Sequence, residues 1–277
     1  MRFWRCMWRA VELTYDRNCL AIAKGASYSG LLALFPVITV TATLLVQAKA
    51  RPVVDVLSHF LSEILPPGAE ELVLARFVVR GEKPVGLLVV ATLLALQAAS
   101  GLMMSLMEGF NSVYGVKGRG WMAQRAMSAL LVISAVLPAV GASLLILFGS
   151  QSERTFIQWL RGATLEGVPI AQGVLLLGQI ARLVVALGTI VLVTALLYRL
   201  GPNRPQRWRN VWPGAMVATV LWLPATLGFS WYVRNLADYN VMYGSIGTVI
   251  ALLAWLYLMA VIACIGCAYN AVTETVE

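Results

Sequence analysis

Charge is scarce in this chain, and so are histidine and cysteine. Only 12% of the 277 residues are charged, histidine occurs once and cysteine occurs four times. A soluble domain carries about 25% charged residues, so this composition excludes that class. Four scattered cysteines are too few for a disulfide framework. No nucleophile stands beside a base in a catalytic spacing, and we expect neither an enzyme nor a cofactor or metal site.

Apolar residues dominate instead. They make up 60% of the chain and recur in runs of about 20 residues, the length that crosses a bilayer. We therefore predict an all-α, polytopic membrane protein, with a single domain built as a six-transmembrane-helix bundle with interfacial amphipathic helices. The predicted spans are residues 25–47, 85–107, 126–148, 173–198, 211–231 and 246–268.

The basic residues predict how the spans are oriented. Net charge is +8, and three segments on one side of the predicted bundle carry basic residues in excess. These residues are Arg2, Arg5, Arg9, Arg17 and Lys24, then Lys117, Arg119 and Arg125, then Arg199, Arg204, Arg207 and Arg209. Basic and acidic residues balance on the opposite side. By the positive-inside rule both termini face the cytoplasm, so the positive charge needs no nucleic acid partner.

The cytoplasmic segment, residues 1–24, is amphipathic. Charge interrupts it before any apolar run begins, so we expect no cleavable signal peptide. Its apolar residues share one helical face, which suits a helix in the headgroup layer. These residues are Phe3, Trp4, Met7, Trp8 and Val11.

The external loop, residues 48–84, also predicts an amphipathic helix, which is either interfacial or a lid over the outer face. His59 stands four residues from both Asp55 and Glu63 in this helix. A solvated face explains this spacing better than a metal site.

A glycine pair opens the last predicted span, at Gly244-Ser245-Ile246-Gly247. A phosphate-binding loop follows a strand and carries a lysine. Neither is found here, so we interpret the pair as the mouth of the span. Small residues recur in three spans at a spacing typical of close helix packing. The series are Gly25, Ser29 and Ala33; Gly101, Ser105 and Gly109; and Gly247, Ala251, Ala260, Cys264 and Ala268.

Three prolines fall near the middle of odd-numbered spans: Pro36, Pro138 and Pro224. A proline inside a helix frees the carbonyl four residues earlier, which must find another partner or a wet cavity. We predict hinges at these positions, with a simple bend as the alternative, since proline is common in membrane helices.

Arg182 is the costliest residue of the sequence. It falls within the fourth predicted span, where a charge costs about 2.5 kcal/mol or more and normally faces a partner or a cavity. Gln172, Gln179 and Thr189 lie on the same stripe of this span, and Gln97 and Glu108 lie on a polar stripe of the second span. Two interpretations are open. Arg182 is either a structural residue bonded to a neighbouring helix or a site for the anionic group of a lipid or metabolite.

Four stretches carry a family resemblance. They are YSGLLALFPVI from Tyr28, FNSVYGVKGR from Phe110, RLGPNRPQRWRNVWPGAMVATVLW from Arg199, and the run from Tyr239 to Asn270. Together they resemble the YihY/BrkB family of bacterial inner-membrane proteins, formerly described as ribonuclease BN. The resemblance implies a six-helix protein of the bacterial inner membrane, with roles in envelope integrity, virulence and the export of lipids or small molecules. The family often ends its last span with Gly-Ala-Glu-x-Asn, and this chain has Ala268 where the glutamate stands.

The polar stripes and the family motifs together give the predicted substrate-binding residues. They are Arg182, Gln179, Gln97, Glu108, Tyr28 and Asn111. Our first hypothesis is a translocator of an anionic lipid or metabolite. The alternative is a structural subunit whose outer helix engages an envelope protein, and a homodimer is compatible with either. A ribonuclease is the weakest hypothesis, because metal-assisted cleavage needs ligands that the cytoplasmic side hardly offers.

Overall fold

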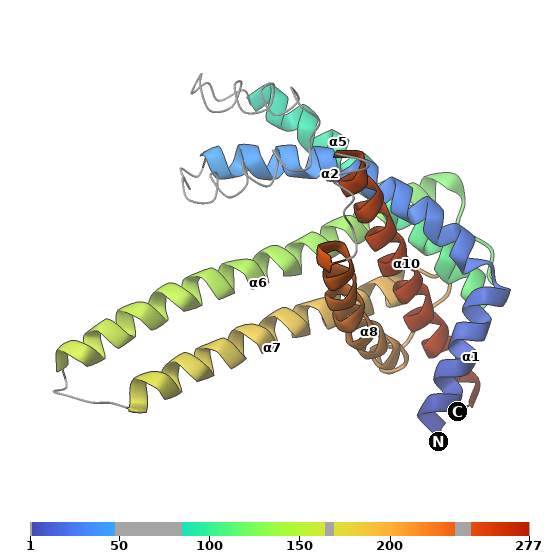
Figure 1. The fold of residues 1–277 in the computed structure, drawn as a ribbon. Helices are drawn as coiled ribbons and strands as arrows, with labels where there is room; N and C mark the ends of the chain where they lie inside the picture. The colour runs from blue at the N-terminus through green and yellow to red at the C-terminus, as the bar shows by residue number, and fades with distance from the viewer. Residues whose placement is uncertain (1, 48–84, 164–168, 236–244, 277) are drawn as a thin grey trace.

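The computed structural model describes residues 2–47, 85–163, 169–235 and 245–276. These residues form seven α-helices and no strand (Figure 1), which confirms the all-α prediction. The helices are α1 (Arg2–Asp16), α2 (Cys19–Gln47), α5 (Val85–Tyr114), α6 (Trp121–Ala163), α7 (Pro169–Leu200), α8 (Trp208–Asn235) and α10 (Ser245–Val276).

Each predicted span lies within one of these helices. Five stretches of the described chain are long and apolar enough to cross a membrane: Thr92–Tyr114, Trp121–Ala142, Gly178–Leu200, Trp208–Tyr232 and Val249–Thr275. The first predicted span lies on α2, whose described side chains form a shorter apolar stretch, Cys19–Leu34. The external loop 48–84, with its predicted amphipathic helix and His59, lies outside the described residues.

Two helices end at residues in the left-handed backbone region, Asn18 with φ 55° and Gly115 with φ 64°. Asn18 separates α1 from α2, and asparagine tolerates this conformation better than most residues. At the end of α5 the Gly115 amide donates to the Ser112 carbonyl, and the Val116 amide donates to the Asn111 carbonyl. This pair of bonds closes a helix whose next residue is a left-handed glycine.

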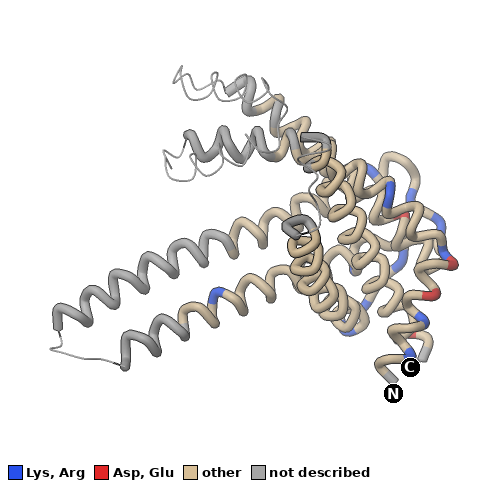
Figure 2. Tube along the Cα trace, viewed as in Figure 1, with Lys and Arg blue, Asp and Glu red and all other residues tan. Residues whose placement is uncertain are grey.

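Both termini lie at one end of the bundle, beside the turns 115–120 and 201–207 (Figure 1). Most of the described charged residues gather there (Figure 2). We call it the basic end, defined by residues 2–24, 108–125, 199–214 and 266–276. From this end the α2/α5 pair and the α6/α7 pair diverge toward the opposite side (Figure 1).

The small-residue series pack helices closely, as predicted. A Cβ added to Gly101 in α5 would lie 3.8 Å from Ser29 in α2, and one added to Gly25 would lie 3.9 Å from the Ser105 hydroxyl. A Cβ on Gly109 would come within 3.1 Å of the Cys264 sulfur in α10. The contact at Gly109 is tighter than usual, whereas those at Gly25 and Gly101 are ordinary van der Waals contacts between α2 and α5.

Helix α1 has three faces where the sequence predicted two. Its buried face carries Cys6 and Ala10, which are 8% and 0% exposed. Trp4 and Trp8 are 72% and 68% exposed on another face, while charged residues occupy the third. Met7, at the edge of the predicted apolar face, is partly buried and packs against the core. The helix has one apolar face against the protein and a second apolar face directed outward. In the sequence the two faces are adjacent and look like a single apolar face.

The predicted hinge prolines Pro36, Pro138 and Pro224 lie inside α2, α6 and α8. Helix α8 contains a second proline, Pro213, in its second turn. Hinge motion at Pro36, Pro138 and Pro224 stays a prediction. Pro213 lies at the basic end, between two residues whose backbone groups bond to Asn270.

Candidate functional site

Arg182 lies near the middle of α7 and is half-buried. Gln179 precedes it by one turn and is exposed. Helix α7 carries one other charged residue, Arg199, at its last turn. Arg182 therefore places a positive charge in an otherwise apolar part of the helix, as the sequence indicated.

The other predicted site residues are spread over two helices. Gln97 and Glu108 are exposed on α5, and Tyr28 is 60% exposed on α2. Helix α5 packs mainly against α2, α6 and α10, whereas α7 packs mainly against α6 and α8. Gln97 and Arg182 thus belong to differently packed helices, and a shared site between them stays a prediction.

Asn111 lies away from Arg182, at the basic end, where it is 4% exposed. Its side-chain oxygen accepts a bond from the Asn203 amide at 2.7 Å. The Asn203 side chain in turn donates to the Lys117 carbonyl at 3.0 Å. Asn111 therefore joins the turn after α5 to the turn after α7, a structural role that its motif alone did not reveal.

Arg119 closes the C-terminus of α7. Its guanidinium donates to the carbonyls of Leu200, Gly201 and Pro202 at 3.1, 2.8 and 2.8 Å. The last carbonyls of a helix lack partners within the helix and carry partial negative charge, so a cation is favourable there. Burial lowers the pKa of the Arg119 guanidinium. Arginine nevertheless stays charged, because its ordinary pKa is far above neutral.

Asn270 holds the start of α8, a role that could not be inferred directly from the sequence. It is fully buried in α10. The Gly214 amide donates to its side-chain oxygen at 2.6 Å, and its side-chain nitrogen donates to the Val211 carbonyl at 3.2 Å. Pro213 stands between these two positions and disturbs the hydrogen bonds of the helix. An asparagine at the end of an apolar run was the available signal, but its partners were not visible.

Helices α7, α8 and α10 meet around two glycines. A Cβ on Gly214 would overlap the carbonyl of Gly266, and a Cβ on Gly266 would overlap the hydroxyl of Tyr198. That hydroxyl donates to the Ala263 carbonyl at 2.8 Å, and Tyr198 is fully buried. Only glycine lets the two backbones approach this closely.

An ion pair joins the turn after α7 to the end of α10. Arg204 donates to Glu274 at 2.9 Å, and the Asn210 side chain donates to the other carboxylate oxygen at 3.0 Å. The Arg204 guanidinium also lies 4.6 Å from the centre of the Tyr114 ring, in a cation–π contact.

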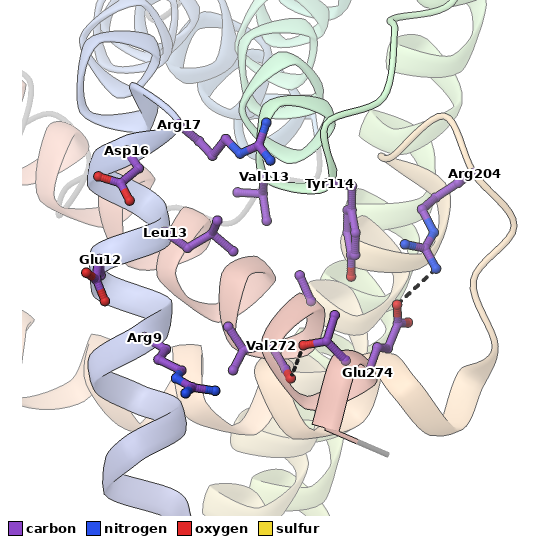
Figure 3. A pocket seen from close by; sticks show the side chains of 12 residues that line it. Arg9, Glu12, Leu13, Asp16, Arg17, Val113, Tyr114, Arg204, Val272 and Glu274 are labelled. Atoms are coloured by element: carbon purple, nitrogen blue, oxygen red, sulfur yellow. Dashed lines mark hydrogen bonds and ion pairs between the residues drawn. The ribbon is translucent and has the colours of Figure 1, made fainter.

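A cleft of about 490 Å³ opens beside this ion pair. It lies between α1, the end of α5, the turn after α7 and the end of α10 (Figure 3). Its charged lining residues are Arg9, Glu12, Asp16, Arg17, Arg204 and Glu274. Within the described parts of the chain, no three His, Cys, Asp or Glu side chains gather closely enough to hold a metal ion. Charged side chains of both signs thus line a cleft of a size that suits a small polar ligand.

Comparison with known proteins identifies the family. The family model described as "Virulence factor BrkB" matches residues 11–277. The chain is 32% identical to the "Putative ribonuclease-like protein YfkH" of Bacillus subtilis over 187 residues, which are 67% of this chain and 65% of that protein.

Two proteins described as "UPF0761 membrane protein" cover more of the chain. The one from Chromobacterium violaceum is 30% identical over 266 residues, 91% of this chain and 57% of the relative. The one from Alkalilimnicola ehrlichii is 32% identical over 266 residues, 91% of this chain and 54% of the relative. The chain thus spans between half and two thirds of the length of these relatives, and no solved structure matches it. The match over nearly the whole chain confirms the resemblance seen in the motifs: the chain belongs to the BrkB (UPF0761) family of integral membrane proteins.

Proposed function

We propose that this chain moves an anionic lipid or an anionic metabolite across the bacterial inner membrane, and that Arg182 binds the anionic group. The observation that carries the proposal is the place of Arg182. It stands about 20 Å from the start of α7 and about 27 Å from its end, at 1.5 Å per residue. A charge near the bilayer centre costs about 2.5 kcal/mol or more, and an anionic ligand bound to Arg182 would offset such a cost.

The arrangement of the helices supports the same proposal. Helices α2 and α5 diverge from α6 and α7 away from the basic end (Figure 1). Arg182 lies in the first half of α7, which begins far from the basic end, and Gln179 adds an exposed amide one turn away. The basic end would face the cytoplasm by the positive-inside rule.

Native mass spectrometry of the detergent-purified full chain tests the proposal. We would compare the wild type with Arg182→Gln and Arg182→Lys, and use Arg209→Gln as the control. Arg209 is exposed at the basic end, so its replacement removes the same charge outside the membrane. A lost charge-assisted hydrogen bond predicts at least about tenfold less retained anion in Arg182→Gln. The lysine variant and the control are expected to retain it.

The opposite result has a definite meaning. If Arg182→Gln retains the same anionic species as the wild type, Arg182 does not bind it, and the translocation proposal loses its support. The structural or partner-binding role of the chain would then be favoured. In either case we propose no ribonuclease activity for this chain.

A further inference from the structure

Four exposed apolar residues form a row along the outward face of α1. They are Trp4, Trp8, Val11 and Tyr15, and they are 72%, 68%, 45% and 73% exposed. Their spacing is i, i+4, i+7 and i+11, which places them on one stripe of the helix. We call this stripe the outer row. Exposed apolar residues are ordinary when they stand singly, whereas a contiguous row marks a surface that contacts a membrane or another protein.

The other two faces of α1 are occupied by the protein and by the cleft. Cys6 and Ala10 are buried and belong to the core that α1 shares with α10. Arg9, Glu12 and Asp16 are exposed, and all three line the cleft of the basic end. The outer row therefore faces neither the core of the protein nor the cleft.

Helix α1 lies beside the end of an apolar stretch of α10. The ring of Phe3 lies 5.8 Å from the ring of Tyr269. Tyr269 stands near the C-terminal end of Val249–Thr275, a stretch that is long and apolar enough to cross a membrane. At this end of the bundle α1 runs across the direction of α6 and α7 (Figure 1). A helix that crosses the end of a span in this way lies along the surface of the bilayer, at the level of the lipid headgroups.

The residue types of the outer row suit this level. Tryptophan and tyrosine collect at the boundary between membrane and water, because their rings are apolar and each carries one polar group. Trp121 at the start of α6 is 70% exposed, and Trp208 and Trp212 at the start of α8 are 41% and 36% exposed. The outer row thus continues a belt of exposed aromatic residues at the basic end. A belt that includes three helices fits a lipid surface better than a single protein partner.

The outer row is held in a fixed direction. At the end of α1 the Arg17 carbonyl accepts a hydrogen bond of 2.6 Å from the Ser112 hydroxyl of α5. The turn at Asn18 then leads directly into α2. Because α1 is joined to two helices of the bundle at this end and packs against α10, it presents the same face outward along its length.

We propose that α1 is a membrane-surface helix whose outer row inserts into the lipid headgroup layer at the basic end. Arg5 and Arg9 stand on the neighbouring charged face, where arginine is favourable beside the phosphates of an anionic lipid surface. Phe3 and Met7, which the sequence placed on the lipid-facing side, contact the protein. The surface does not depend on the proposed function, and it holds for either orientation of the chain in the membrane.

The experiment measures the surroundings of α1 with spin labels. The full chain is placed in nanodiscs of phosphatidylethanolamine and phosphatidylglycerol, so that water reaches both faces of the bilayer. The variants Trp4→Cys and Tyr15→Cys carry a nitroxide label on the outer row. Arg5→Cys and Asp16→Cys are the matched controls, because neighbouring side chains point about 100° apart around a helix. The four native cysteines are buried, so the unsubstituted chain gives the background labelling.

We expect the labels at Trp4 and Tyr15 to be more accessible to oxygen than to a water-soluble nickel complex, and the two controls to show the reverse. The apolar face of a surface helix lies about 5–10 Å into the boundary between headgroups and acyl chains, where oxygen is enriched and the nickel complex is excluded. Equal accessibility to nickel at Trp4 and Arg5 would place the outer row in water and overturn the proposal. Low accessibility to both reagents at Trp4 and Tyr15 would also overturn it, because a second copy of the chain or another protein would then cover the row.

Discussion

Replacing Asn270 with alanine should destabilise the protein, because this buried side chain bonds two backbone groups of another helix. The Gly214 amide and the Val211 carbonyl would each lose their bond to this side chain, of 2.6 and 3.2 Å. Asn270 is fully buried, so water does not readily replace it. A hydrogen bond contributes about 0.5–1.5 kcal/mol net, so the two together predict a loss of about 1–3 kcal/mol in the free energy of unfolding.

The assay is unfolding of the purified protein in mixed micelles, with increasing sodium dodecyl sulfate in a mild detergent, followed by circular dichroism. The control is Asn203→Ala, which removes an exposed side-chain bond of 3.0 Å to the Lys117 carbonyl. An exposed bond of this kind contributes about 0.5–1 kcal/mol. If Asn270→Ala costs no more than Asn203→Ala, Asn270 does not hold the start of α8 as described.

Further predictions concern packing, the helix terminus and orientation. Gly214→Ala should lower the free energy of unfolding by at least about 3 kcal/mol in the same assay, because the added Cβ overlaps the Gly266 carbonyl. Gly228→Ala is the control, since its Cβ meets nothing within 4 Å and should change stability little. Equal losses in the two variants would contradict the close approach of α8 and α10. Arg119→Gln should lower the free energy of unfolding by about 2 kcal/mol and expose the turn 201–207 to protease, since three carbonyls lose their donor; unchanged proteolysis would refute this. The four native cysteines are buried, so a membrane-impermeant maleimide should react mainly with a cysteine introduced by Lys117→Cys. If the basic end faces the cytoplasm, this cysteine is labelled only after the cells are opened. Labelling in intact cells would contradict the predicted orientation.

The positions of the helices could be predicted from hydropathy, but their full lengths could not. Helix α6 continues to Ala163 and α10 to Val276, beyond the predicted ends at 148 and 268. Hydropathy identifies the part of a helix that is apolar enough for the lipid core. The helix itself can extend beyond that part, because its backbone hydrogen bonds do not depend on apolar side chains. The small-residue series were more informative, because the close approach of Gly101 to Ser29 follows from the spacing itself.

The contacts of the basic end could not be predicted, because they join distant residues. Arg119 was visible as a basic residue of a short turn, yet its partners are carbonyls about 80 positions later. A backbone carbonyl carries no sequence signature. Asn111 was singled out through its motif, but its bond to the Asn203 amide depends on how two turns meet.

The candidate site was predictable to a similar degree. The cost of a charge in an apolar run marked Arg182, and the structure places it half-buried in α7. The cleft beside Arg17 and Arg204 was not foreseen, since its walls come from four separate segments. In the sequence these basic residues indicated only the orientation of the helices. The cleft that they line is formed by the folded chain.

Transport itself is the most direct test of the central claim. The full chain would be reconstituted into lipid vesicles together with the labelled anionic species that the wild type retains in mass spectrometry. We predict that this species crosses the bilayer faster with the wild type than in protein-free vesicles, and that Arg182→Gln removes the difference while Arg209→Gln does not. If the wild type moves the species no faster than protein-free vesicles do, the chain is not its translocator.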